Sequence, residues 1–233
     1  MTASDLIERP ASRRGLLGGL ATGGLVLALP GCTGMGGFGL VDAVQRLLFL
    51  SSDRAFARML QRDGFWDQQV ATLGLNNILG SRGDVLSRIL TSSLFKSRLD
   101  GAFADIAYRG AERAAPIVTD AVRVIGIQNA IDLVRGGPTA ATSYLRRSMG
   151  TRLVDAMVPE LGDAMRLASE PLVGQALSAL AGVDIPQIAT RFADSIDNTI
   201  WQQMGLEETA IRRNPASTND PAIISVFGTA ARL

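Results

Sequence analysis

Apolar residues recur at steps of three and four along most of the chain from Leu40 onward, which predicts amphipathic α-helices. No run alternates apolar and polar residues over a length that would indicate a β-strand. The pattern therefore predicts an all-α fold, a single multi-helix bundle of roughly eight to ten helices over residues 40–233. The longest stripe of apolar and small residues at helical spacing consists of Leu99, Phe103, Ile106, Ala107, Gly110 and Ala114.

The first helix of the pattern starts at Leu40. We expect it to stop near Asp63-Gly64, because glycine suits the position just after a helix. Phe65 and Trp66 are then expected to dock as hydrophobic plugs. Residues 67–83 show no clear period and fit either a short helix or an irregular crossover.

Caps and prolines mark the later helices. Asp84 suits the N-cap of a helix that has Leu94 on its inner side. Pro116 is expected to mark a break or the first turn of another helix, and Pro159 a kink or a restart. Asp184 is expected to cap a long final helix.

Near the end of that long helix, Glu208 and Arg212 stand four residues apart. This spacing puts both side chains on one face, and we expect a surface ion pair worth about 0.3–0.5 kcal/mol. Asp220-Pro221 then predicts the start of a last short helix.

The least generic stretch is Ile127–Gly150, which has the pattern of a helix, a stop and a second helix. Ile131 and Val134 are expected on the buried face of the first helix. Gly136-Gly137 can take the left-handed conformation that ends a helix, and Pro138 pre-sets the start of the next one. We therefore expect a helix–turn–helix corner here.

Composition suits a packed core, because 47% of the 233 residues are apolar and 19% are charged. The chain has no histidine and one cysteine, which removes the commonest general base and excludes a disulfide framework or a cysteine-rich zinc site. We expect no cofactor and no metal. Without residues 1–31, which hold two of the 22 acids and three of the 23 bases, 20 of each remain. A balanced chain gives no general attraction for nucleic acid.

Residues 1–31 have the pattern of a bacterial export signal: a polar start, a modest apolar run and small residues before a processing point. Arg13-Arg14 resembles the twin-arginine signal that an export receptor reads. The apolar run from residue 15 to 31 is shorter and richer in glycine than a membrane span of roughly 20 apolar residues requires.

Leu29-Pro30-Gly31-Cys32 resembles the lipobox of bacterial lipoproteins, with Pro30 in place of the more usual alanine or serine. A lipid on Cys32 would anchor the protein to a membrane, and residues 33–39 would form a short flexible tether. An unmodified thiol after an ordinary signal is the alternative. Thr33 is not the aspartate that favours the inner membrane, so we expect an outer-membrane lipoprotein on the periplasmic side of the bacterial cell envelope.

Several short motifs resemble a family of bacterial envelope proteins catalogued as a domain of unknown function. The resemblance covers most of residues 40–228 and is weakest at 66–83. It implies a helical fold and an envelope location but no activity. The motifs are Asp63-Gly64-Phe65, Arg109 with Ala111 and Glu112, Ala130-Ile131-Asp132, Gly136-Gly137, Ala140-Ala141-Thr142, Tyr144-Leu145-Arg146, and the tail from Arg212 to Pro215 and on to Val226-Phe227-Gly228.

No catalytic set stands out in the sequence. Asp63, Glu112 and Asp132 are the only candidates for carboxylate chemistry, and they would have to converge in one cleft. Helix caps and ion pairs with nearby arginines are the alternative. The candidate polar cluster as a whole consists of Asp63, Arg109, Glu112, Asp132, Thr142, Tyr144 and Arg146.

The sequence therefore favours a lipid-anchored helical binding or interaction module over an enzyme. Its expected partners are the membrane, through the lipid on Cys32, and an envelope protein or an apolar ligand held between helices. A structural envelope protein without a ligand and a carboxylate-dependent enzyme are the alternatives.

Overall fold

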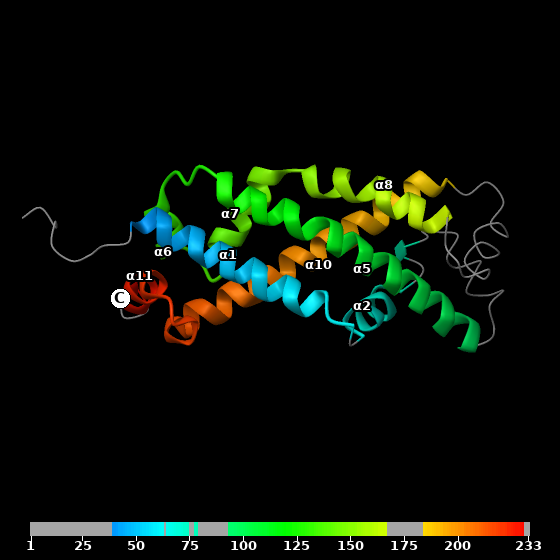
Figure 1. Ribbon diagram of the computed structural model, residues 1–233, viewed down its shortest axis with the longest axis horizontal. Coiled ribbons are helices and arrows are strands. Elements are labelled where there is room, and N and C mark those ends of the chain that lie inside the picture. Colours follow the sequence, from blue (N-terminus) through cyan, green and yellow to red (C-terminus); the bar gives the residue numbers. More distant parts are fainter. Residues whose placement is uncertain (1–38, 63, 75–76, 79–92, 167–183, 231–233) are drawn as a thin grey trace, which may run out of the picture. The chain divides into compact units, whose positions relative to one another are not determined.

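The computed structural model describes residues 39–62, 64–74, 77–78, 93–166 and 184–230, all within the unit of the chain that spans residues 37–233. Every regular element in these residues is helical, eight α-helices and one 3-10 helix, so the predicted all-α fold of eight to ten helices is confirmed (Figure 1). None of the described helices is long and apolar enough to span a membrane. The elements are α1 (Leu40–Met59), α2 (Phe65–Leu73), α5 (Ser93–Val124), α6 (Ala130–Arg135), α7 (Ala140–Met149), α8 (Arg152–Arg166), α10 (Ile185–Arg213), η2 (Pro215–Thr218) and α11 (Pro221–Ala230).

Two long helices, α5 and α10, each contribute more buried apolar residues to the core than any other described helix. α10 packs against α1, α7 and α8, while α5 packs against α1, α2 and α8, and the two also contact each other (Figure 1). Phe103 of α5 meets Phe192 of α10 edge to face, with 5.4 Å between the ring centroids. The predicted stripe of α5 is buried along its length, from Leu99 to Ala114.

A glycine allows α5 to lie close to its neighbours. A Cβ at Gly110 would stand 3.1 Å from methyl groups of Leu161 on α8 and Ile196 on α10. Because real Cβ contacts are rarely that short, the crossing of these three helices depends on the missing side chain.

Neither proline inside a helical stripe starts a new helix. α5 runs unbroken through Pro116, and α8 runs unbroken through Pro159. A proline inside a helix costs about 3 kcal/mol, and burial on both sides offsets that cost. Ala114 and Val118, on either side of Pro116, are buried in the core. Met157 and Leu161, on either side of Pro159, are buried as well. The break expected at Pro116 is therefore wrong.

The first helix ends earlier than expected, at Met59. Gly64 does adopt a left-handed conformation, with φ of 89°, but it directly precedes α2 instead of ending α1. Trp66 is buried and packs edge to face on half-buried Phe65, so their docking is confirmed. Leu94 is 65% exposed, so its expected place on the inner side of a helix is wrong. Asp84, its proposed cap, lies outside the described residues.

Candidate functional site

The helix–turn–helix corner predicted in Ile127–Gly150 is formed by α6 and α7. Gly136 is extended at the end of α6, with φ of −68° and ψ of 179°, and not left-handed as expected. Space explains the glycine, because a Cβ there would lie 2.6 Å from the Cβ of Ala140 and 2.8 Å from the carbonyl oxygen of Asp132. The turn is tight enough to exclude any side chain at this position.

The buried face of α6 also differs from the expectation. Ile131 is 46% exposed, whereas Ala130, Leu133 and Val134 are buried. The predicted burial of Val134 is confirmed, and the predicted burial of Ile131 is wrong. A helix of six residues makes fewer than two turns, so its apolar residues do not define a single face.

Glu208 of α10 holds the start of α7. Its side chain is fully buried, and its two oxygens accept hydrogen bonds from the backbone N–H groups of Ala141, at 3.0 Å, and Thr142, at 2.7 Å. The first N–H groups of a helix have no partner inside the helix, and a carboxylate there also suits the positive end of the helix dipole. Glu208 therefore works as a cap supplied by another element.

Arg212 holds the end of α6 in the same way. Its Nε donates to Glu208 Oε1 at 2.8 Å, and its terminal nitrogens donate to the carbonyl oxygens of Val134 and Leu133 at 3.0 and 2.7 Å. The guanidinium lies 4.8 Å from the centroid of the Phe227 ring. The predicted pairing of Glu208 with Arg212 is confirmed, but its expected place on the surface is wrong, because α6, α7 and α11 cover it.

Two members of the predicted polar cluster line a pocket of about 340 Å³ between α7 and α10, which we call the α7–α10 pocket. Thr142 is buried there, and its hydroxyl has no partner among the described residues. Arg146 reaches across and donates to Asp197 at 3.0 Å and to Asn198. The positive charge of Arg146 is therefore already matched within the protein.

Asp197 sits behind this pocket as a nearly buried carboxylate. Burial raises its pKa above the ordinary value, and hydrogen bonds from Trp201 and Arg146 oppose this rise by stabilising the charged form. The Trp201 bond is the shorter, at 2.7 Å from Nε1 to Oδ1. The group is thereby tied to α10 and α7 and serves to fix Arg146.

The rest of the polar cluster lies elsewhere. Asp132 is exposed on α6, and Tyr144 donates its hydroxyl to the carbonyl oxygen of Gly126 at 2.7 Å. Neither lines the α7–α10 pocket. Asp63 falls outside the described residues.

Arg109 and Glu112 line a pocket of about 600 Å³, which we call the α2–α5 pocket. The loop before α2 and its first turn form one wall, and one face of α5 forms the other. Two motifs that carry the family resemblance meet here, Gly64-Phe65 and the stretch around Arg109. The structure thus brings Arg109 and Glu112 together and separates them from Asp132 and Thr142. The lining charges and aromatic rings are those of Arg62, Phe65, Trp66, Asp67, Asp105, Tyr108, Arg109 and Glu112.

The charges around the α2–α5 pocket are not paired with one another. Within the described residues no ion pair joins Arg62 or Arg109 to Asp67, Asp105 or Glu112, whereas Arg58, Arg146 and Arg212 each have a carboxylate partner. Of the two, Arg62 does contact an aromatic ring, lying 5.6 Å from the centroid of Tyr108. The pocket therefore presents available charges of both signs.

The first turn of α2, which lines this pocket, also carries further hydrogen-bond donors. The indole nitrogen of Trp66 is buried and has no partner among the described residues. Gly64, which precedes α2, offers no side-chain cap, and the first helical bond runs from Gln68 N–H to the Gly64 carbonyl oxygen at 3.1 Å. The earlier N–H groups of α2 therefore have no partner within the helix.

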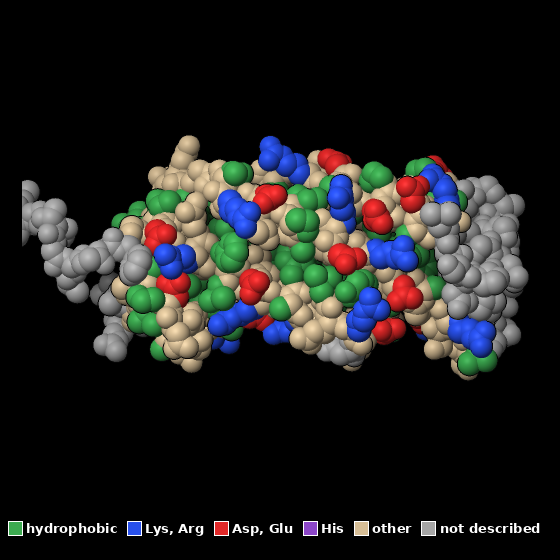
Figure 2. All heavy atoms as spheres, viewed as in Figure 1, with side chains coloured by type: hydrophobic (Ala, Val, Ile, Leu, Met, Phe, Trp, Pro, Cys, Tyr) green, Lys and Arg blue, Asp and Glu red, His purple; other side chains and the backbone are tan. Residues whose placement is uncertain are grey.

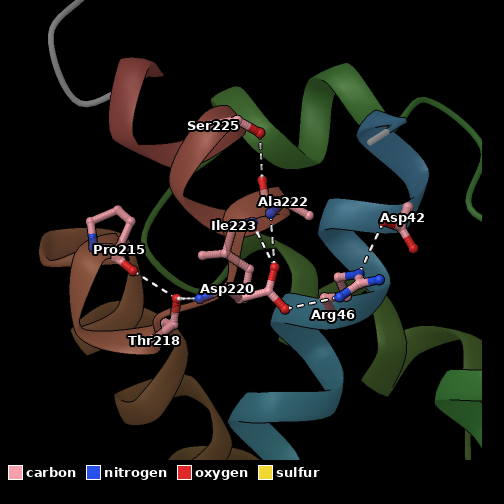
Figure 3. Close-up of polar contacts among 8 residues, drawn as sticks. All are labelled: Asp42, Arg46, Pro215, Thr218, Asp220, Ala222, Ile223 and Ser225. Carbon is pink, nitrogen blue, oxygen red and sulfur yellow. Dashed lines mark hydrogen bonds and ion pairs between the residues drawn. The ribbon is translucent and has the colours of Figure 1, made fainter. Parts of the chain in front are cut away.

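A third hollow of about 500 Å³ lies between α1, the end of α5 and the η2–α11 junction, and we call it the α1–α11 groove. Arg46 of α1 donates to Asp42 at 3.0 Å and to Asp220 at 3.1 Å, as Figure 3 shows. Asp220 also accepts from the N–H groups of Ala222 and Ile223, so it caps α11 as its position before Pro221 predicts. Its contact with Arg46, 174 residues earlier in the chain, has no local signal in the sequence.

Among the described residues, no group of three or more cysteine, aspartate or glutamate side chains could hold a metal ion. Of the three carboxylates proposed for catalysis, Glu112 and Asp132 do not share a pocket, and Asp63 lies outside the described residues.

Comparisons with known proteins give one match. A family model described as "Protein of unknown function (DUF4197)" matches residues 37–228. No curated protein and no solved structure matches the chain.

Proposed function

We propose that this protein is a lipid-anchored, periplasm-facing module that binds an exposed segment of another envelope protein through the α2–α5 pocket. The chain belongs to the family described as Protein of unknown function (DUF4197). The proposal has two parts, a location and a binding site. Each part has its own support and its own test.

The binding part rests on charges that converge on the α2–α5 pocket and form no ion pair with one another among the described residues. Two arginines and three carboxylates face one hollow of about 600 Å³ without neutralising one another. Charged groups near a protein surface gain most from a partner that brings the opposite charges into a partly dry site. A polypeptide segment with both acidic and basic side chains meets that requirement, and Tyr108 and Phe65 offer it rings to pack on.

This lining also supports one of the two expected kinds of ligand over the other. An apolar ligand would leave Arg109, Asp105 and Glu112 without partners on binding, at a cost in free energy. A charged segment would pair them. The pocket therefore favours a protein partner over an apolar molecule.

Site-specific photocrosslinking in living cells tests the binding part. A photoreactive residue replaces Asp105, which lines the pocket, or Arg113, which is also exposed on α5 but does not line it. We expect one defined adduct from position 105 and none from position 113. Arg109→Glu should abolish the adduct, while the matched Arg113→Glu should leave it intact.

Equal adducts from both positions, or an adduct that survives Arg109→Glu, would contradict the binding site. A protein that forms no adduct at either position would instead fit the structural alternative. Circular dichroism of each variant verifies that its helices are retained, because both substitutions change exposed side chains and should leave the fold unchanged.

The location part rests on residues 1–33. Arg13-Arg14 supports export by the twin-arginine route, Cys32 supports lipid attachment, and Thr33 supports the outer membrane. Cys32→Ser should move the mature protein from the membrane fraction to the soluble fraction of the periplasm. Retention of the variant in the membrane fraction would sink the lipid-anchor proposal.

A further inference from the structure

Exposed apolar side chains are unevenly distributed over the described residues. Eight large apolar side chains are exposed, and six of them belong to α1, α6, α11 and the last turn of α5. Val124, the last residue of α5, is the most exposed of all, at 81%. The six are Leu40, Val41, Phe49, Val124, Ile131 and Ile224.

The elements that carry these side chains meet at one end of the helical unit, which we call the α1–α6–α11 end. α1 packs against both α6 and α11, and α6 packs against α11 (Figure 1). Val122 and Arg123 of α5 line the α1–α11 groove together with Phe49 of α1. Figure 2 shows apolar side chains between a few charged ones where α1 begins.

Polar contacts hold this end together. Figure 3 shows Asp220 joined to Arg46 of α1 and to the first N–H groups of α11, while Arg46 is also joined to Asp42. The charges of Asp42, Arg46 and Asp220 are thus paired within the protein. Such a surface offers apolar contact more than it offers charge.

The length of chain before α1 indicates what this surface meets. Leu40 follows Cys32 by eight residues, which span at most about 28 Å in any conformation. A lipid on Cys32 would therefore keep the start of α1 close to the bilayer. The other end of α5 lies a helix length away, because 32 residues of α-helix extend about 48 Å.

We propose that the α1–α6–α11 end rests on the surface of the phospholipid bilayer, with Val124, Ile131 and Leu40 in its interfacial layer. This inference depends on the proposed lipid anchor at Cys32. The chain after residue 31 has 20 acids and 20 bases, so the contact is with lipid of any headgroup charge and is driven by apolar burial.

This orientation has a consequence for the proposed binding site. The face of α5 that lines the α2–α5 pocket runs from Ala104 to Glu112, about 18 to 30 Å along the helix from Val124. With Val124 at the membrane, the pocket is held out in the periplasm, where an exposed segment of another protein can reach it.

Depth-dependent fluorescence quenching tests the contact. The full lipidated protein, purified in detergent, is inserted into phosphatidylcholine vesicles that contain nitroxide-labelled lipid. A fluorophore is attached to a cysteine introduced by Val124→Cys, Ile131→Cys or Leu94→Cys. Leu94 is the matched control, because it is another exposed aliphatic residue at the opposite end of α5.

We expect quenching at positions 124 and 131 to be at least about twice that at position 94, since interfacial side chains enter the outer several ångströms of the bilayer. The difference should persist in 0.5 M salt, roughly, because screening weakens charge contacts and leaves apolar ones.

Flotation of the vesicles separates the two possible failures. Protein that floats with the vesicles but shows equal quenching at all three positions overturns the membrane contact and leaves the anchor standing. Protein that does not float overturns the anchor, and the contact falls with it. Quenching that disappears in high salt also overturns the inference, because it would indicate an electrostatic attachment.

Discussion

At the scale of single residues, the buried carboxylate of Glu208 joins the start of α7 to α10. Its carboxylate accepts from Ala141, Thr142 and Arg212, and no part of it reaches solvent. Glu208→Ala leaves these donors buried and unpaired. We expect a loss of about 3–5 kcal/mol in the free energy of unfolding, measured by urea denaturation of the soluble Cys32→Ser chain.

Two controls accompany this prediction. Glu208→Gln keeps the shape and one strong acceptor, so its loss should be smaller than that of Glu208→Ala. Asp120→Ala removes an exposed ion pair with Arg123 and should change stability by less than about 0.5 kcal/mol. A Glu208→Ala chain as stable as the Asp120→Ala chain would show that the buried pair does not hold the corner.

This residue also shows what spacing can and cannot predict. Residues four apart on a helix share a face, so the sequence predicts that Glu208 and Arg212 pair. Whether that face is exposed depends on α6 and α7, which lie more than 60 residues away in the chain. Local spacing holds no information about a cover supplied from elsewhere.

Asp220 predicts a pH dependence. Burial favours its neutral form, but the hydrogen bonds from Arg46 and from the N–H groups of Ile223 and Ala222 outweigh it and lower its pKa below the ordinary 3.8. Its contribution to stability is therefore fully present above pH 3.8 and is lost as the pH falls through the lowered pKa.

Asp220→Ala should therefore lower stability by about 1 kcal/mol at pH 7, as expected for a lost helix cap, and the deficit should shrink below pH 3.8. Unfolding free energies measured from pH 7 down to about pH 2 provide the readout. Asp42→Ala, which also loses a bond to Arg46 but caps no helix, should cost less. A deficit that grows on acidification would contradict the assigned direction.

At the scale of elements, the crossing of α5 with α8 and α10 predicts opposite effects for two glycines of one helix. Gly101 has open space around it, whereas a Cβ at Gly110 would meet Leu161 and Ile196 at 3.1 Å. Gly101→Leu should raise stability by about 0.5–1 kcal/mol through helix propensity, and Gly110→Leu should lower it by about 1–3 kcal/mol through overpacking.

Thermal unfolding of the two variants under identical conditions measures this difference. Both variants replace glycine by leucine within α5, so the gain from helix propensity is the same in each. The difference between their stabilities therefore measures the cost of overpacking at the crossing of α5 with α8 and α10. Equal effects at the two positions would mean that the helices separate easily and that Gly110 is not needed for their approach.

Elements were predictable where periodicity is long and poorly predictable where it is short. The stripe of α5 was readable because many turns repeat the same face, yet Pro116 suggested an end that packing on both sides overrides. In α6, which has only six residues, the buried face is partly wrong because the prediction included Ile131, which is exposed. The glycine at 136 was correctly read as a stop, but the reason is a lack of space and not a left-handed backbone.

At the scale of the whole molecule, the candidate site could be predicted only in part. Arg109 and Glu112 share one turn of α5, so their proximity follows from spacing. The meeting of α5 with the first turn of α2 is a tertiary contact with no local signal. For the same reason the predicted cluster divides, and Thr142 and Arg146 belong to a different pocket.

The last prediction concerns how the C-terminal helix supports the α1–α6–α11 end. Phe227 is buried in α11 under the guanidinium of Arg212, which in turn bonds the last carbonyl groups of α6. Phe227→Ala removes the surface on which Arg212 rests. We expect a loss of about 3–4 kcal/mol and faster hydrogen exchange in α6 and α11 than in α8, measured by mass spectrometry.

Ile224→Ala provides the control, because Ile224 lies on the same helix but is 38% exposed and should cost less. The pattern of exchange decides the argument more than its magnitude does. If α6 exchanges no faster than α8 in the Phe227→Ala chain, then Arg212 keeps α6 in place without α11, and this end of the molecule is not coupled through the Phe227–Arg212 contact.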